Sequence, residues 1–293
     1  MAKQKKIPLS ITLFIFLIGT SQEDLKLWTG YSAQARVTKE WRISAGQLLL
    51  FSPEFVELSS MQNSVNLTYR LNSKIRFGTG YLRSSDPSDP DQEARNRVTA
   101  RFGLNMRLGK VRFNNNLRGE WHFPERSKFE YRLRHGLRIH RGSWGLPWKT
   151  TPFINNEVHY YLSGKPLQYR DEEGEKVVKQ SPDGLHAYRF TIGIRFRPFK
   201  RANASLSYMR QTEFNIGSKY REINVVDPRN GRVRRSFNHF SVLMFRFSYQ
   251  IHFNRKSTRS ASASNFQTLP QHLLSKEKSE FLVDSDLTKA IHN

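Results

Sequence analysis

Residues 243–253 read LMFRFSYQIHF, and apolar and polar side chains alternate along most of this stretch. Successive side chains of an extended chain point to opposite sides, so residues two apart share a face. The odd-numbered positions from Leu243 to Phe253 are all aliphatic or aromatic, whereas the even-numbered positions include Arg246, Ser248 and Gln250. The stretch therefore predicts a strand with one apolar face and one polar face.

The same alternation of apolar and polar residues, with a period of two, extends towards the N-terminus over most of residues 25–253. In residues 97–108 the even-numbered positions are apolar, and three of the odd-numbered positions are arginine. Such sustained alternation indicates strands rather than helices. Further strands are expected at 25–37, 41–50, 64–71, 74–83, 110–121, 128–140, 152–162, 186–197 and 201–212.

The connections between these strands alternate in length. Tight links at 72–73, 109–110 and 198–200 contrast with long polar segments at 84–93, 163–184 and 213–236. Short turns at one end and long loops at the other are typical of a transmembrane β-barrel. A soluble sandwich also alternates, but these polar faces carry too much arginine for a dry core, and sandwich strands usually run to about five or six residues. The sequence therefore predicts an all-β fold, an antiparallel up-and-down transmembrane β-barrel.

The candidate segments number eleven, whereas single-chain bacterial barrels usually have an even number of strands. We expect ten or twelve strands, with either one false candidate or a further strand hidden in 53–60 or 214–226. A barrel of about 10–12 strands has an interior that side chains largely fill, which leaves at most a narrow aqueous path.

Composition excludes several other classes of protein. The chain has 293 residues, a mean hydropathy of −0.65 and no cysteine. A polytopic helical membrane protein needs about 20 continuous apolar residues for each span, and disulfides or thiolate metal sites need cysteine. The net charge of +23 is typical of nucleic-acid-binding proteins, but export and the lack of a binding motif argue against that partner.

The two ends of the chain differ from the middle. Residues 1–21 contain three lysines, an apolar run from Ile7 to Ile18 and small residues at Gly19 and Ser21, which predicts a signal peptide and Sec-dependent export. Residues 22–253 form the predicted barrel. Residues 254–293 are rich in serine and charge without alternation, which predicts a disordered polar tail.

If the apolar faces meet lipid, the polar faces line the interior, where we expect a network of charges. Its acidic members are Glu120, Glu130 and Glu157. Its basic members are Arg97, Arg101, Arg107, Arg112, Arg118, Arg132, Arg134, Arg138, Arg189, Arg195, Arg197 and Arg246. Two hypotheses stay open: Arg–Glu pairs fill a closed barrel, or an arginine-rich lumen forms a narrow pore that prefers anions.

Basic residues also occur in the predicted long loops, at Arg170, Lys176, Lys179, Arg229, Arg232, Arg234 and Arg235. They could bind the phosphates of outer-membrane lipids such as lipopolysaccharide, or they could form a solvated surface.

No local spacing in the sequence selects a catalytic or metal site. A lipid hydrolase would need a serine beside a histidine base. The candidates are His122, His159 and His186 with Ser163, Ser205 or Ser207, and Glu120 or Glu157 could orient the histidine. The histidines are dispersed, so we expect no catalytic residue, no cofactor and no metal.

Six segments carry a family resemblance. In chain order they are LWTGYSAQARVTKEWRIS, LTYRLNSKIRFGTGY, FNNNLRGEW, FEYRLRHGLRI, PFINNEVHYYL and FRFSYQIHF. Together they resemble the uncharacterised bacterial outer-membrane barrels of domain of unknown function twenty-four ninety, over about residues 24–253. The shared elements are Trp28, Gly80-Tyr81, Arg118-x-Glu120, Arg132-x-Arg134 and Asn156-Glu157. The resemblance implies an outer-membrane barrel and no assigned activity.

We therefore expect an outer-membrane β-barrel of a Gram-negative bacterium, placed there by the barrel-insertion machinery, that is either structural or a narrow anion-preferring pore. Two alternatives remain: an outer-membrane lipid hydrolase, and an exported soluble β-protein that binds an anionic ligand. Labelling by a serine-reactive probe would identify the first, and extraction without detergent would identify the second.

Overall fold

The computed structural model describes residues 25–53, 55, 57–89, 91–124, 128–142 and 145–252. The expected signal peptide at 1–21 and the expected tail at 254–293 lie outside these residues. In the described part of the chain, no helix is long and apolar enough to cross a membrane.

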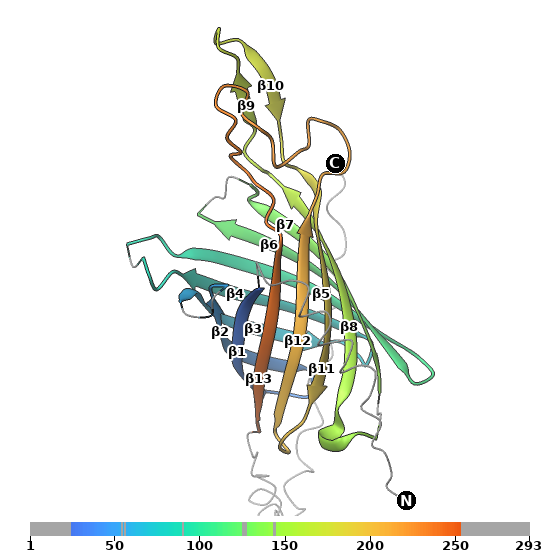
Figure 1. Cartoon of the computed structure of the whole chain (residues 1–293). Helices are drawn as coiled ribbons and strands as arrows, with labels where there is room; N and C mark the ends of the chain where they lie inside the picture. The colour runs from blue at the N-terminus through green and yellow to red at the C-terminus, as the bar shows by residue number, and fades with distance from the viewer. Residues whose placement is uncertain are drawn as a thin grey trace, which may run out of the picture. The chain divides into compact units, whose positions relative to one another are not determined.

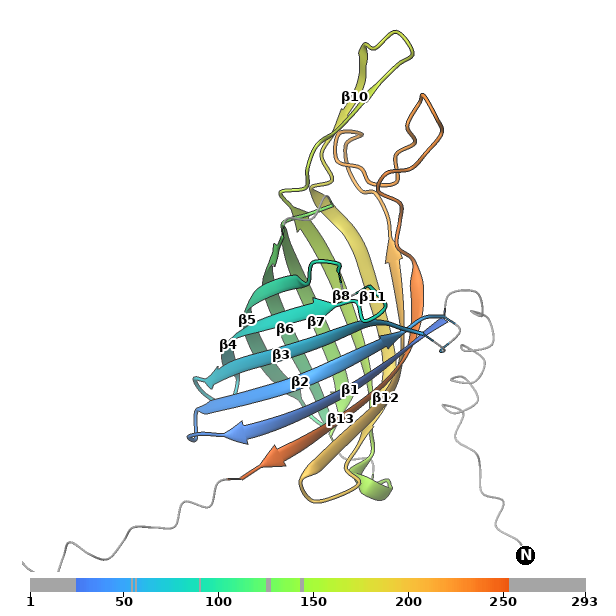
Figure 2. The same ribbon diagram turned by 90° about the vertical axis from the view of Figure 1, so that its left-hand side faces the viewer.

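Eleven strands form one closed barrel (Figures 1 and 2). In chain order they are β1 (Leu25–Arg36), β2 (Trp41–Phe51), β3 (Leu58–Arg70), β4 (Ile75–Ser85), β5 (Arg95–Leu108), β6 (Val111–Phe123), β7 (Tyr131–Arg141), β8 (Thr151–Leu162), β11 (Gly184–Phe196), β12 (Ala202–Glu213) and β13 (Phe240–Ile251). A separate hairpin, β9 (Leu167–Arg170) and β10 (Lys176–Gln180), rises from the β8–β11 connection, and a short 3-10 turn, η1 (Pro147–Lys149), precedes β8.

The predicted all-β barrel is confirmed, but the expectation of an even number of strands is wrong. Each of the eleven candidate segments overlaps one barrel strand. Chain direction alternates around an up-and-down barrel, so an odd number makes the first and last strands run the same way. β1 accordingly pairs with β13 in parallel, from Leu25 opposite Ser241 to Ala35 opposite Ile251, whereas the other neighbouring strands are antiparallel.

In the described residues, the two regions suspected of hiding a strand add no further strand to the barrel. Residues 58–63 extend β3 beyond its predicted start, and residues 214–226 contain only one partner of an isolated bridge, Val226 to Val233. The hairpin β9–β10 lies within residues 163–184, which the sequence presents as a polar loop. Alternation is too short in these two strands to be distinguished from loop sequence.

The barrel has an apolar outer face and a polar inner face. On β5 to β8 the exposed side chains are Val98, Phe102, Leu117, Trp121, Tyr131, Leu133 and Ile154, whereas their sequence neighbours Thr99, Glu120, His122, Arg134 and His159 are buried. A sheet that closes on itself has no hydrogen-bonding edge, and its two faces become an outside and an inside. The polar set therefore lines the interior.

Connections at the two ends of the barrel differ as predicted. The turns after β1, β3, β5 and β11 are short, whereas the connections β8–β11 and β12–β13 are long and stand together at the opposite end (Figures 1 and 2). Tyr169 Oη donates to the carbonyl oxygen of Val225 at 3.0 Å, and the Ser181 amide donates to the carbonyl oxygen of Tyr220 at 2.8 Å. These contacts join the two long connections to one another.

Gly193 on β11 lies close against the neighbouring strand β12. A Cβ atom at this position would lie 2.4 Å from the Ser207 Cβ and 2.6 Å from the Leu206 carbonyl oxygen, both on the neighbouring strand. We expect Gly193→Ala to destabilise the barrel by roughly 1–3 kcal/mol, because the two backbones must separate. Gly136→Ala is the matched control, since the nearest atom to a Cβ there is 3.8 Å away. Urea unfolding in detergent would measure both variants, and equal stability would contradict this account.

Candidate functional site

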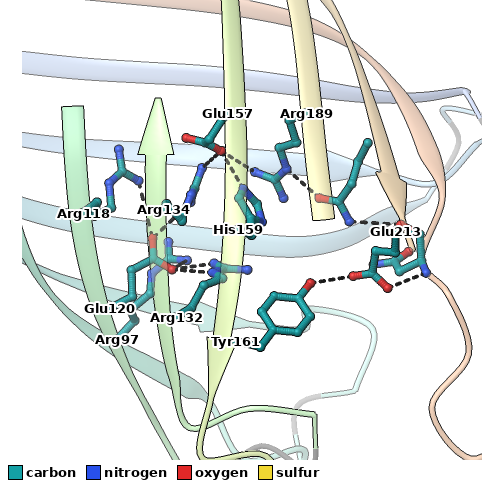
Figure 3. A network of polar contacts seen from close by, with 12 residues as sticks. Arg97, Arg118, Glu120, Arg132, Arg134, Glu157, His159, Tyr161, Arg189 and Glu213 are labelled. Atoms are coloured by element: carbon teal, nitrogen blue, oxygen red, sulfur yellow. Dashed lines mark hydrogen bonds and ion pairs between the residues drawn. The ribbon is translucent and has the colours of Figure 1, made fainter. Parts of the chain in front are cut away.

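Three neighbouring strands each project two ionisable side chains into the interior. Residues two apart on a strand share a face, so the pairs follow directly from the alternation. They are Glu120 and His122 from β6, Arg132 and Arg134 from β7, and Glu157 and His159 from β8. Figure 3 shows five of the six, all except His122, with their side chains close together.

Glu120 is the centre of the first cluster, and its side chain is fully shielded from solvent. Arg132 donates to Glu120 Oε2 through Nε at 2.8 Å and through Nη2 at 2.6 Å, and Arg134 Nη1 donates to Oε1 at 3.0 Å. Arg97 and Arg118 lie at 3.4 and 3.6 Å, and His122 Nε2 lies 3.2 Å from Oε2. One carboxylate thus forms ion pairs with four guanidinium groups.

Glu157 is the centre of the second cluster. Its Oε1 accepts a hydrogen bond from Arg134 Nη2, lies 2.7 Å from His159 Nε2 and lies 3.8 Å from Arg189 Nη1. Because Arg134 contacts both carboxylates, it joins the two clusters into one network. Arg189 Nε extends that network by donating to Gln211 Oε1 on β12 at 2.6 Å.

A third carboxylate, Glu213, lies where the barrel wall meets the long loops. It accepts hydrogen bonds from Tyr161 Oη at 2.7 Å, from Lys128 Nζ at 2.9 Å and from the Asn238 amide at 2.8 Å. Beside it, buried apolar side chains pack together: Phe129, Tyr161, Ala187 and Ile223, with Phe237 against them. This part of the long-loop end is therefore filled by protein.

An apolar patch interrupts the polar interior on β1, β12 and β13. Its members are Trp28, Met209, Phe240, Val242 and Met244. Two cations lie over the Phe240 ring, with Lys26 Nζ at 5.3 Å and Arg189 Cζ at 5.9 Å from its centroid. The members of the patch pack against one another. The patch therefore stabilises the strands that close the barrel and does not form a binding surface.

The residues predicted for the interior network fall into three groups. Those with a carboxylate partner are Arg97, Arg118, Arg132, Arg134 and Arg189, with Glu120 and Glu157. Those on the inner face without an ion pair in the described part of the chain are Arg101, Arg138, Arg195 and Arg246. Those at the short-turn end are Arg107, Arg112 and Arg197.

Glu130 departs from the prediction. Trp121, whose ring is exposed on the outer face, donates through Nε1 to Glu130 Oε1 at 3.2 Å. Strand β7 begins at Tyr131, and Glu130 lies in a bend before it, so strict alternation no longer applies to its side chain. Glu130 is therefore not a member of the interior network.

Sequence reasoning missed interior residues in the first four strands. Arg36, Arg42, Arg70 and Arg76 line one cavity at the short-turn end of the barrel. The signal that could have identified them is a spacing. Arg36 and Arg42 are separated by five residues that contain a turn, and so are Arg70 and Arg76. Glu213 was also missed, because its partners lie far away in the sequence.

Some of the basic residues of the long loops contact other loop residues. Arg234 Nη2 lies 3.5 Å from Asp227 Oδ2, and Arg229 Nε donates to the Asp171 carbonyl oxygen. Arg235 is only 6% exposed, and burial lowers the pKa of its guanidinium. Burial likewise raises the pKa of Tyr169, over which Arg234 lies. Arg235 is therefore not available to lipid, whereas Lys176, Lys179 and Arg232 are exposed.

The structure brings a histidine beside each of two carboxylates but adds no nucleophile. Among the described residues, no hydrogen bond joins a serine hydroxyl to His122, His159 or His186; the last lies 3.0 Å from the Phe214 carbonyl oxygen through Nδ1. Within the same residues, no group of three histidine or acidic side chains is arranged to hold a metal ion. The carboxylate, histidine and arginine side chains of this network hold one another in fixed positions inside the barrel.

Comparisons with known proteins support the resemblance inferred from the sequence. The model of a family described as protein of unknown function (DUF2490) matches residues 25–222. No curated protein matches the chain. Among solved structures, a NanC porin is 11% identical with a TM-score of 0.42, over 77% of this chain and 99% of that one. A bacterial polysaccharide outer membrane secretin is 11% identical with a TM-score of 0.39, over 71% of this chain and 64% of that one.

Proposed function

The chain belongs to the DUF2490 family, whose function is unknown, and we propose that this member is an outer-membrane β-barrel that acts as a narrow pore with a preference for anions. The observation that carries the proposal is the imbalance of charge inside the barrel. In the described part of the chain, Glu120 and Glu157 are the carboxylates that pair with interior arginines, and further arginines share the same surface.

The outer face supports a position in a membrane. Exposed aliphatic side chains such as Val65 and Leu117 occupy the middle of the strands. Exposed aromatic side chains lie near both strand ends: Trp121, Tyr131 and Tyr160 towards the long loops, and Trp41, Phe77 and Tyr249 towards the short turns. An apolar band between two aromatic girdles is the surface that a bilayer requires of a barrel.

The inward side chains are large on one side of the barrel and small on the other, which leaves a candidate path for ions. Strands β6 to β12 fill their side with arginine, histidine and aromatic side chains. Strands β1 to β4 instead present small inward residues, which include Gly30, Ser32, Gly46, Ser64 and Gly80. We infer that ions pass along this smaller side, between backbone and small polar groups on one wall and guanidinium groups on the other.

Arg246 lies between the two walls. It projects inward from β13 beside Gly30, is exposed to solvent, and has no ion pair in the part of the chain that the structure describes. A guanidinium that water reaches inside a barrel attracts anions and repels cations. Arg246 is accordingly the residue through which the selectivity of the proposed pore can be tested.

Conductance across a planar bilayer, with the reversal potential recorded in a salt gradient, tests the proposal. Refolded wild-type protein is expected to give discrete steps and an anion-selective reversal potential. Arg246→Glu is expected to lower the ratio of anion to cation permeability several-fold, because the sign of charge reverses inside the path. The control is Lys176→Glu, which makes the same change of charge on the exposed β9–β10 hairpin.

Two outcomes would contradict the pore. Folded and inserted wild-type protein that gives no steps would leave a structural barrel closed by its Arg–Glu network. An equal change in selectivity for Arg246→Glu and Lys176→Glu would show that surface charge, rather than an interior path, controls the current.

We also propose lipid as the partner of the exposed loop cations. Lys176, Lys179 and Arg232 remain accessible after the other basic loop residues have bonded within the loops. Phosphates of lipopolysaccharide are the anions nearest to such a surface in an outer membrane. Assembly by the barrel-insertion machinery follows from the same location and is part of the proposal.

A further inference from the structure

Two neighbouring hairpins at the short-turn end repeat one seven-residue pattern. The first reads RVTKEWR at residues 36–42, and the second reads RLNSKIR at residues 70–76. Each has an arginine at both ends, an aliphatic second residue, a hydrogen-bonding third residue and an apolar sixth residue. The pattern therefore places two arginines at the same position of two successive turns.

Both turns are built by the same bonds. Thr38 Oγ1 accepts the amide hydrogens of Glu40 at 3.1 Å and Trp41 at 3.0 Å. Asn72 Oδ1 accepts the amide hydrogens of Lys74 and Ile75, both at 2.8 Å. Short polar side chains commonly close turns by bonding to the backbone two or three residues further on. The arginines at the ends of each turn are thus held in a fixed relation to one another.

Each turn sets its two arginines directly opposite one another across the strand pair. Arg36 lies opposite Arg42 on β1 and β2, and Arg70 lies opposite Arg76 on β3 and β4. Like charges in this position destabilise a sheet. The two pairs also repel one another, because all four guanidinium-bearing residues line the same cavity. An anion bound between the two pairs would relieve this repulsion.

The four arginines surround a cavity of about 180 Å³. Thr68 and Asn105 contribute polar atoms to its lining, and Arg76 Nη2 donates to Asn105 Oδ1 at 2.9 Å. Glu40 also lines it, but its Oε2 accepts a hydrogen bond from Thr38 Oγ1 at 3.0 Å. None of the four arginines forms an ion pair with a carboxylate in the described ranges, in contrast to the arginines around Glu120 and Glu157.

Two other arginine groups at the same barrel end, in the described part of the chain, combine charge and space less well. Arg107 lies opposite Arg112 across the β5–β6 turn, yet neither lines this cavity. A second group that includes Arg138 and Arg195 encloses about 10 Å³, which is too small for a polyatomic anion. Of these three groups, the one between the first two hairpins has room for an anion among guanidinium groups.

We propose that this cavity, lined by Arg36, Arg42, Arg70 and Arg76, is a binding site for a soluble phosphate or phosphate ester. Guanidinium groups match phosphate oxygens through paired hydrogen bonds, and several of them together favour a doubly charged anion over chloride. The arginines project to the inner face, so a molecule in the aqueous mouth reaches them, whereas bilayer lipid meets the outer face. The site would bind its anion whether or not the barrel conducts, so it is independent of the proposed pore.

Pyrophosphate protection against heat unfolding tests the site directly. The full-length protein is held in micelles of an uncharged detergent without lipid, and sodium chloride keeps the ionic strength constant. Wild type is expected to show a saturable rise in its unfolding temperature. In Arg42→Gln/Arg70→Gln the apparent affinity for pyrophosphate should fall on the order of a hundredfold, because each arginine supplies a charge-assisted hydrogen bond.

The variants include controls for charge and for folding. Arg107→Gln/Arg112→Gln removes the same number of charges at the same end and should keep wild-type affinity. Arg42→Gln/Arg70→Gln leaves one arginine in each opposed pair, so without pyrophosphate it should unfold at a temperature no lower than wild type. If the double glutamine variant fails to fold, Arg42→Lys/Arg70→Lys takes its place. Lysine keeps the positive charge but cannot form the paired hydrogen bonds of a guanidinium group, so this variant should also bind pyrophosphate more weakly than wild type.

Three results would overturn the proposal. The first is no saturable protection of wild type beyond that given by chloride at equal ionic strength. The second is an equal loss of affinity in the Arg107 and Arg112 control, which would show a general field of the barrel mouth. The third is protection by short-chain phosphatidylglycerol but not by pyrophosphate, which would assign the arginines to a lipid headgroup.

Discussion

Glu120→Gln is expected to lower the free energy of unfolding of the barrel by about 3–5 kcal/mol, the usual result of removing one partner from a buried ion pair. The substitution keeps the shape of the side chain but removes the charge that faces Arg97, Arg118 and Arg132. Arg134 would keep its bond to Glu157. Urea unfolding in detergent, together with heat-modifiability on a gel, would measure the change.

A control and a second substitution separate this network from a general effect of charge. Glu172→Gln removes the same charge at an exposed position and should leave stability unchanged. Adding Arg132→Gln to Glu120→Gln should recover part of the loss, since one uncompensated cation is removed with its partner. If Glu120→Gln unfolds at the same urea concentration as wild type, the network contributes nothing to stability and another account of its burial is needed.

Glu213→Ala is expected to free the long β12–β13 connection from the barrel wall. Tyr161 and the backbone amide of Asn238 would lose their acceptor, and Lys128 would keep only its bond to the Ser236 carbonyl oxygen. Unsatisfied buried donors destabilise a protein by about 1–3 kcal/mol each, so the connection between β12 and β13 should open far more often. Trypsin should then cleave at Lys219 or Arg221 at least about tenfold faster than in wild type, because cleavage follows the population of the open form.

Asn238→Ala is the matched control for this release. Glu213 bonds to the backbone amide of residue 238, and Gln211 bonds to its carbonyl oxygen, so the substitution removes neither contact. Its cleavage rate should equal that of wild type. Equal cleavage of the Glu213→Ala variant would show that the apolar cluster around Phe129 and Ile223 holds the loops without help from the carboxylate.

Part of the interior could be predicted because it depends on local alternation. The faces of Glu120, Arg132 and Arg134 follow from counting residues along β6 and β7, and the structure places all three on the inner side. The same counting fails at Glu130, where a bend precedes the strand. Alternation therefore predicts a side chain's face only while the backbone remains extended.

Which charges meet could not be predicted in this way. Four arginines converge on Glu120 because the register of β5, β6 and β7 brings them to one level of the wall. Lys128 and Glu213 are 85 residues apart, and β8 and β11 lie between their strands. Only a curved, closed wall brings their side chains within hydrogen-bond distance.

By itself, the sequence determined that this chain forms alternating strands, that their apolar faces point away from their arginines, and that short turns and long loops lie at opposite ends. Only the tertiary structure decided that eleven strands close through a parallel pair, that one carboxylate serves several arginines, and that two arginine hairpins enclose a cavity. The physical reason is the range of the forces involved. Alternation is a property of each extended segment, whereas register, closure and the space between hairpins depend on the lengths and twists of all the strands together.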